Sequence, residues 1–118
     1  MNFKNNFNKF KQYSEYFNDL SDAEISELLD NTGAKISAIG DLSKESKDIC
    51  AEIISSVKQS IKLGLNLKNI NVKKLKKAFT ELKALAKSEL ADEAKQSIEL
   101  MIGLTELFID NNASARNW

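Results

Sequence analysis

The chain has 118 residues, of which 42% are hydrophobic and 29% are charged, and its 17 basic and 17 acidic residues give a formal net charge of zero. One globular domain fits this length and composition, and the zero charge argues against a protein that coats nucleic acid over its whole surface. With no histidine and one cysteine, the sequence excludes Ser-His-Asp triads, HExxH zinc helices, CxxC motifs and internal disulfides.

Residues that break helices are scarce. The chain contains no proline and four glycines, and both residue types favour turns over helix interiors. We therefore expect an all-α fold. It is predicted to be an antiparallel helical bundle of four main helices plus an aromatic-rich N-terminal helix, within a single domain spanning residues 1–118.

The N-terminal segment, residues 1–20, carries one aromatic stripe. Aromatic residues recur at steps of three or four, which predicts a helix over about residues 3–18. The stripe consists of Phe3, Phe7, Phe10, Tyr13 and Phe17. Two interpretations stay open: the stripe packs on the rest of the domain, or it is a docking arm for a protein partner or a second copy.

A second helix is predicted to begin after Ser21, because Ser21 and Glu24 have the spacing of a capping box. Its apolar face comprises Ile25, Leu28, Leu29, Ile36 and Ile39. Gly33, within the sequence DNTG, can end a helix in the left-handed conformation. The apolar periodicity resumes beyond it, so the sequence leaves the end of this helix open.

A third helix is predicted over residues 43–63, with small serines that allow close helix approach and with Cys50 beside its apolar row. We expect the Cys50 thiol to be buried and unreactive. The following segment, residues 63–71, has alternating leucines at Leu63, Leu65 and Leu67. A single strand cannot form a sheet, so we interpret it as a connection whose leucines fill the core.

The fourth and fifth helices are predicted over residues 72–90 and 93–110. Apolar residues surround much of the fifth helix, which favours the most buried position in the bundle, and Asp92 is a candidate for its cap. The end, residues 111–118, reads as a polar tail apart from Trp118. This tryptophan either packs back, lacks order or anchors a partner.

Charge is segregated along the chain, although the total is zero. The net charge is +3 in residues 1–14, −7 in 15–52, +8 in 53–88 and −4 in 89–118. The most basic stretch is residues 71–87, at the fourth helix, with six lysines and one acid. Its lysines are Lys73, Lys74, Lys76, Lys77, Lys83 and Lys87.

Like charges four residues apart destabilise a helix, so the lysine-rich helix is expected to meet negative charge from elsewhere. The first candidate source is internal, with the acidic second and fifth helices flanking it. The second is nucleic-acid phosphate, although the only arginine is Arg116 and no aromatic residues alternate with the lysines for base stacking. The third is an acidic protein partner.

No catalytic, metal-binding or cofactor-binding residue is predicted. Ser55 and Lys58 match SxxK, but the companion motifs SDN and KTG are absent. The carboxylate pairs, Glu24 with Glu27 and Asp92 with Glu93, lie at expected helix starts, where they complement the helix dipole. No phosphate-binding glycine loop occurs either.

The leading hypothesis is therefore a non-enzymatic protein-binding module, such as an adaptor, inhibitor or assembly subunit. Its candidate surfaces are the aromatic stripe and the lysine-rich helix. One alternative is nucleic-acid binding through residues 72–90. Another is a self-assembling structural or surface-coating protein that uses the aromatic helix. We expect a cytoplasmic location without a membrane span, because the N-terminus lacks an apolar signal region and the most apolar stretch, residues 100–109, is short.

Overall fold

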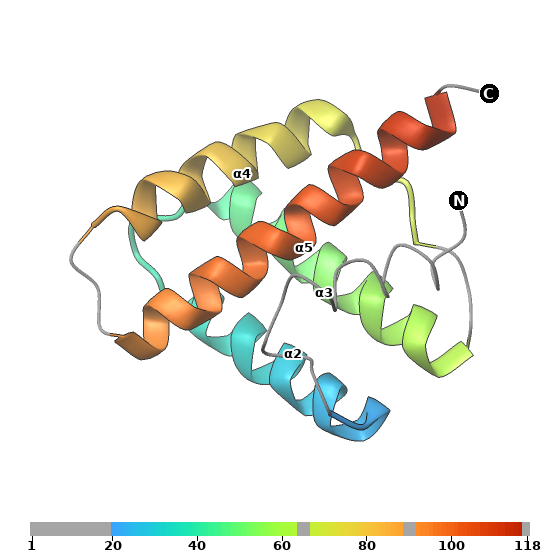
Figure 1. Ribbon diagram of the computed structural model, residues 1–118. Helices are drawn as coiled ribbons and strands as arrows, with labels where there is room; N and C mark the ends of the chain where they lie inside the picture. Colours follow the sequence, from blue (N-terminus) through green and yellow to red (C-terminus); the bar gives the residue numbers. More distant parts are fainter. Residues whose placement is uncertain (1–19, 64–66, 89–91, 117–118) are drawn as a thin grey trace.

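The computed structural model describes residues 20–63, 67–88 and 92–116. Every regular element in these ranges is a helix, which confirms the all-α fold with four main helices (Figure 1). The helices are α2 (Asp22–Ser37), α3 (Lys44–Leu63), α4 (Val72–Ala86) and α5 (Asp92–Arg116). The predicted N-terminal helix, its aromatic stripe and Trp118 lie outside the described residues.

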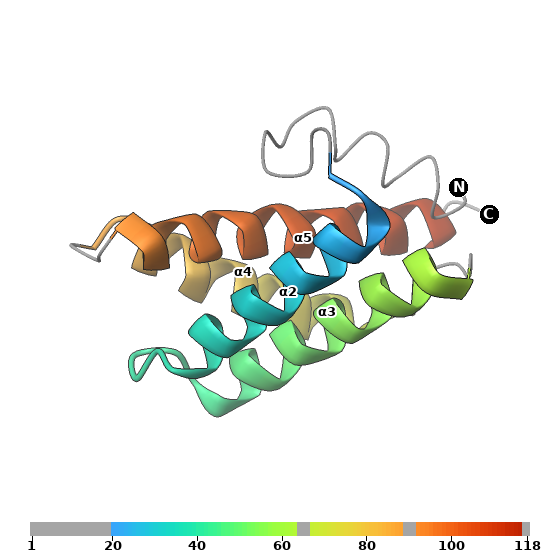
Figure 2. The ribbon, with the colours of Figure 1, turned by 90° about the horizontal axis from the view of Figure 1, so that it is seen from below.

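The four helices share one core, and α5 is central to it. This helix packs against each of the other three, while α3 also packs against α2 and α4. As a result, α2 and α4 lie on opposite sides of the bundle (Figures 1 and 2). The largest fully buried side chains come from all four helices: Ile25, Leu29, Ile36, Ile53, Val57, Leu75, Leu82, Ile98, Met101, Leu104 and Phe108.

Helix α2 begins with the predicted capping box. The Ser21 hydroxyl accepts a hydrogen bond from the Glu24 N–H, and the Glu24 carboxylate accepts one from the Ser21 N–H, both at 3.2 Å. The helix then continues through Gly33 to Ser37. A Cβ at Gly33 would lie 3.2 Å from the Ile54 Cδ1, so the missing side chain lets α2 approach α3 closely.

The connection between α3 and α4 is described from residue 67 onward, and this part contributes to the core. Leu67 and Ile70 are buried, but Leu63 is 62% exposed, so the prediction that Leu63 fills the core is wrong. The Lys68 N–H donates to the Ser56 hydroxyl at 3.0 Å, which ties the described part of the connection to α3.

Two helix ends differ from the predicted bounds. Helix α4 ends at Ala86 rather than at 90, and Lys87 is its C-cap. Helix α5 continues to Arg116, so the predicted end at 110 is wrong. The physical reason is Asn112, which is buried and donates from its side-chain amide to the Ile70 carbonyl. This bond anchors a polar segment that contains no helix breaker.

In the described ranges no helix is both long enough and apolar enough to cross a membrane.

Candidate functional site

Helix α4 divides its residues between two faces. Leu75, Ala78, Leu82 and Leu85 are buried against the core. The N-cap is Asn71, whose side-chain oxygen accepts from the Lys73 N–H at 2.9 Å. Because the buried residues occupy a single side, residues three or four apart on the opposite side point to solvent.

The outer side of α4 is a row of lysines. Lys73, Lys76, Lys83 and Lys87 are exposed, with the exposed Thr80 completing the spacing of three, four, three and four residues. We call these four lysines the lysine face. The exposed residues of α4 include no carboxylate, because its one acid, Glu81, is half-buried. The helix therefore presents a surface of one charge sign over about four turns.

Two other contacts involve lysines of α4. The Lys77 Nζ lies 2.8 Å from the Glu45 Oε2 of α3. This hydrogen bond lowers the pKa of Glu45 and raises the pKa of Lys77. The Lys83 Nζ lies 4.9 Å from the centre of the Phe79 ring on the same helix, within the range of a cation–π contact.

The prediction that α2 and α5 supply the negative charge next to the lysines of α4 is therefore only partly correct. Helix α5 lies beside α4 as expected, but α2 lies across the bundle, and the ion pair that forms comes from α3. In the described part of the chain, no carboxylate forms an ion pair with Lys73, Lys76 or Lys87. The acids of α2 point elsewhere because α3 and α5 separate them from α4.

The inward-facing acid, Glu81, has a structural role that sequence reasoning missed. Its carboxylate accepts from the Ser43 N–H at 3.0 Å and from the Ser43 hydroxyl at 2.9 Å, and it also accepts from the Ser46 hydroxyl. The Ser43 hydroxyl in turn accepts from the Ser46 N–H at 3.2 Å. Glu81 thus completes a capping box for α3 from a different helix, in place of an acid at position 46.

These contacts keep Glu81 ionised. Hydrogen bonds from the Ser46 hydroxyl, and then from the Ser43 backbone and side chain, lower the pKa of Glu81 against the opposing effect of burial. The available sequence signal was a serine at the start of α3 without a glutamate or glutamine three residues later. The local pattern shows an incomplete box but does not say which distant acid completes it.

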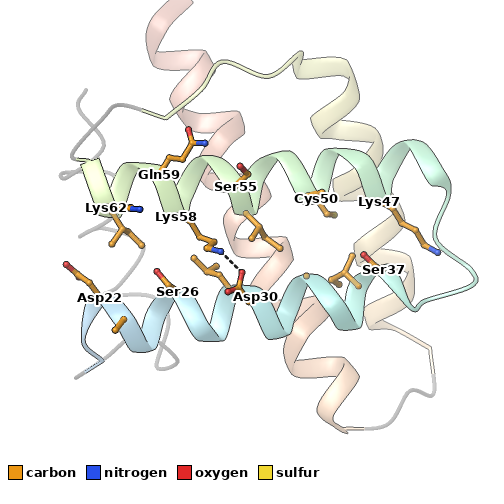
Figure 3. Close-up of a pocket in the computed structure, with 17 residues that line it drawn as sticks. Asp22, Ser26, Asp30, Ser37, Lys47, Cys50, Ser55, Lys58, Gln59 and Lys62 are labelled. Carbon is orange, nitrogen blue, oxygen red and sulfur yellow. Dashed lines mark hydrogen bonds and ion pairs between the residues drawn. The ribbon is translucent and has the colours of Figure 1, made fainter.

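A groove of about 720 Å³ runs between α2 and α3 (Figure 3). Its lining includes apolar residues such as Leu29, Ile36 and Ile54. Its two walls are joined by an ion pair in which the Lys58 Nζ lies 2.6 Å from the Asp30 Oδ1 (Figure 3). Lys58 of the SxxK match is therefore a cation held by a carboxylate, which does not suit a catalytic base.

Cys50 also lines this groove, but its side chain is 1% exposed. Burial, with a smaller contribution from the charge of Glu81, raises the pKa of the Cys50 thiol to about 12. The predicted burial of Cys50 is confirmed, and because the thiolate is the reactive form, the raised pKa is consistent with the prediction that this thiol is unreactive.

The remaining predicted sites receive no further support. Within the described ranges, no group of three or more Cys, Asp and Glu residues is arranged to hold a metal ion. The aromatic stripe of Phe3, Phe7, Phe10, Tyr13 and Phe17 stays a prediction. Comparisons with protein-family models, with curated proteins and with solved structures found no match to this chain.

Proposed function

We propose that this chain is a non-enzymatic protein-binding module whose lysine face contacts an acidic surface of a partner. One observation carries the proposal: Lys73, Lys76, Lys83 and Lys87 are exposed on one side of α4, and the only carboxylate of that helix is taken up in capping α3. A surface of one charge sign steers the encounter with a partner of the opposite sign and selects against like-charged proteins.

The non-enzymatic part of the proposal has its own support. The chain has no histidine, and the thiol of Cys50 is buried with a raised pKa of about 12. Lys58, the lysine of the SxxK match, is paired with Asp30. Cys50 and Lys58 are therefore poorly suited to act as a nucleophile and a general base.

The test is affinity capture from a native lysate of the source organism, using the full chain as bait. Two charge-reversed baits accompany the wild type: Lys73→Glu/Lys76→Glu in the lysine face, and Lys44→Glu/Lys47→Glu on α3. The pairs are matched, because each has a spacing of three residues near a helix start and changes the charge equally. After nuclease treatment, we expect the α3 variant to capture the same proteins as the wild type. The α4 variant should lose them.

Capture of the same proteins by all three baits would contradict a role for the lysine face.

A second candidate function, nucleic-acid binding, draws on the same exposed lysines. It predicts that DNA or RNA is recovered without nuclease treatment and lost with the α4 variant. If four lysines each contact a phosphate, affinity for duplex DNA falls by roughly two decades between 50 and 200 mM salt. A flat salt dependence removes this candidate.

A further inference from the structure

The lysine face has a counterpart of opposite sign on α2. This helix carries the acids Asp22, Glu24, Glu27 and Asp30 against a single base, Lys35. All four acids are exposed and fall within residues 22–30. The N-terminal half of α2 is therefore a concentrated negative surface.

The fold uses only part of this negative charge. Asp30 pairs with Lys58 across the groove, and the Glu24 carboxylate accepts from the Ser21 N–H. In the ranges that the structure describes, no basic side chain forms an ion pair with Glu24 or Glu27. Both carboxylates keep acceptor capacity toward solvent.

The two charged surfaces cannot neutralise each other within one molecule. Helices α2 and α4 lie on opposite sides of the bundle, with α3 and α5 between them (Figure 1). Their outer faces point in different directions, so a contact between these two surfaces requires two molecules. The surfaces also match in spacing, since Glu24 and Glu27 are three residues apart, as are Lys73 and Lys76.

We propose that a second copy of this chain is a partner of the lysine face, and that the contact is made by the Glu24 and Glu27 surface of α2. This inference rests on the proposed function, because it takes the lysine face as the binding surface. The contact joins two different surfaces, so each copy keeps one surface for a further copy. Association is therefore head-to-tail and produces short chains instead of a closed two-fold dimer.

The acids of α5 form a weaker complement. Glu106 and Asp110 are exposed on its outer side, but Gly103 and the half-buried Ile102 and Ile109 lie near them. The acidic residues of α2 are closer together in sequence. Because exposed ion pairs contribute little individually and are screened by salt, the association is weak and is strongest at low salt.

The test is sedimentation velocity of the full chain over a protein concentration series. At about 10 mM salt, where the Debye length is about 30 Å, the sedimentation coefficient should rise with concentration. At about 1 M salt, where that length is about 3 Å, it should stay at the monomer value. Two neutralised variants remove one surface each: Lys73→Gln/Lys76→Gln/Lys83→Gln/Lys87→Gln, and Glu24→Gln/Glu27→Gln. Glutamine at position 24 preserves the capping box.

Each neutralised variant alone should remain monomeric at low salt. An equimolar mixture should form dimers and nothing larger, because each variant supplies one intact surface. The control, Glu106→Gln/Asp110→Asn, should associate like the wild type. A wild-type chain that stays monomeric at low salt, variants that still associate alone, or a mixture without dimers would each overturn the inference. A monomeric wild type that still captures proteins through the lysine face leaves the proposed function standing.

Discussion

The N-termini of α2 and α3 are capped in two different ways. At α2, Ser21 and Glu24 complete a capping box within one turn. At α3, Ser43 supplies the hydroxyl, but Glu81 of α4 supplies the carboxylate from 38 residues along the chain. Both arrangements satisfy backbone N–H groups that have no partner inside the helix.

The difference between these caps matters for function because it determines what α4 presents to solvent. A local cap stabilises one helix start and leaves the rest of the bundle unchanged. The cap from Glu81 joins α3 to α4 and turns the only acid of α4 inward. The outer side of α4 is then left with lysines, which form the surface proposed for recognition.

The largest effect is expected for Glu81→Ala. This change removes a charged acceptor from Ser43 and Ser46, and the expected loss in the free energy of unfolding is about 2 kcal/mol. Urea unfolding followed by circular dichroism measures it. The matched control is Glu106→Ala, an exposed acid on the outer side of α5, for which a change within about 0.5 kcal/mol is expected. Equal effects of the two changes would contradict the assigned role of Glu81.

A smaller effect is the difference in unfolding free energy between alanine variants of the two N-cap serines, Ser21 and Ser43. Ser21→Ala removes an exposed local cap and should cost about 1 kcal/mol. Ser43→Ala should cost more, about 1.5 kcal/mol, because the Ser43 hydroxyl accepts from the Ser46 N–H and also donates to the Glu81 carboxylate. The same unfolding experiment ranks the two variants. The opposite ranking would mean that the contact with Glu81 adds no stability.

The smallest effect is on the pH dependence of stability. It is measured as the difference in unfolding free energy between the wild type and Glu81→Gln. The pKa of Glu81 in the folded chain lies below its usual value of 4.5. As pH falls, the unfolded chain therefore takes up this proton first, and the stability contributed by the carboxylate is lost. The difference should be constant above about pH 5.5 and shrink below pH 4.5.

The comparison cancels the contribution of Glu24, whose pKa is also lowered, because that acid is present in both proteins and Glu81 does not contribute to its shift. A difference that stays constant down to pH 3, or that grows as pH falls, would contradict the lowered pKa of Glu81. Chemical unfolding at each pH is the measurement.

The sequence predicted what local pattern controls and missed what tertiary contact controls. The capping box at Ser21 and the burial of Cys50 were predicted from spacing and apolar periodicity. The extension of α5 to Arg116 depends on the Asn112 contact with Ile70, and the cap of α3 depends on Glu81. These contacts join residues about 40 positions apart, and no local signal identifies such partners.

The central claim is that the lysine face is free to recognise a partner because its lysines do not hold the fold together. The most direct test is the urea-unfolding free energy of Lys73→Glu/Lys76→Glu. Reversal removes like-charge neighbours and places negative charge near the start of the helix, so the variant should be at least as stable as the wild type. A loss of more than about 1 kcal/mol would place these lysines among the residues that stabilise the bundle, and would contradict the account.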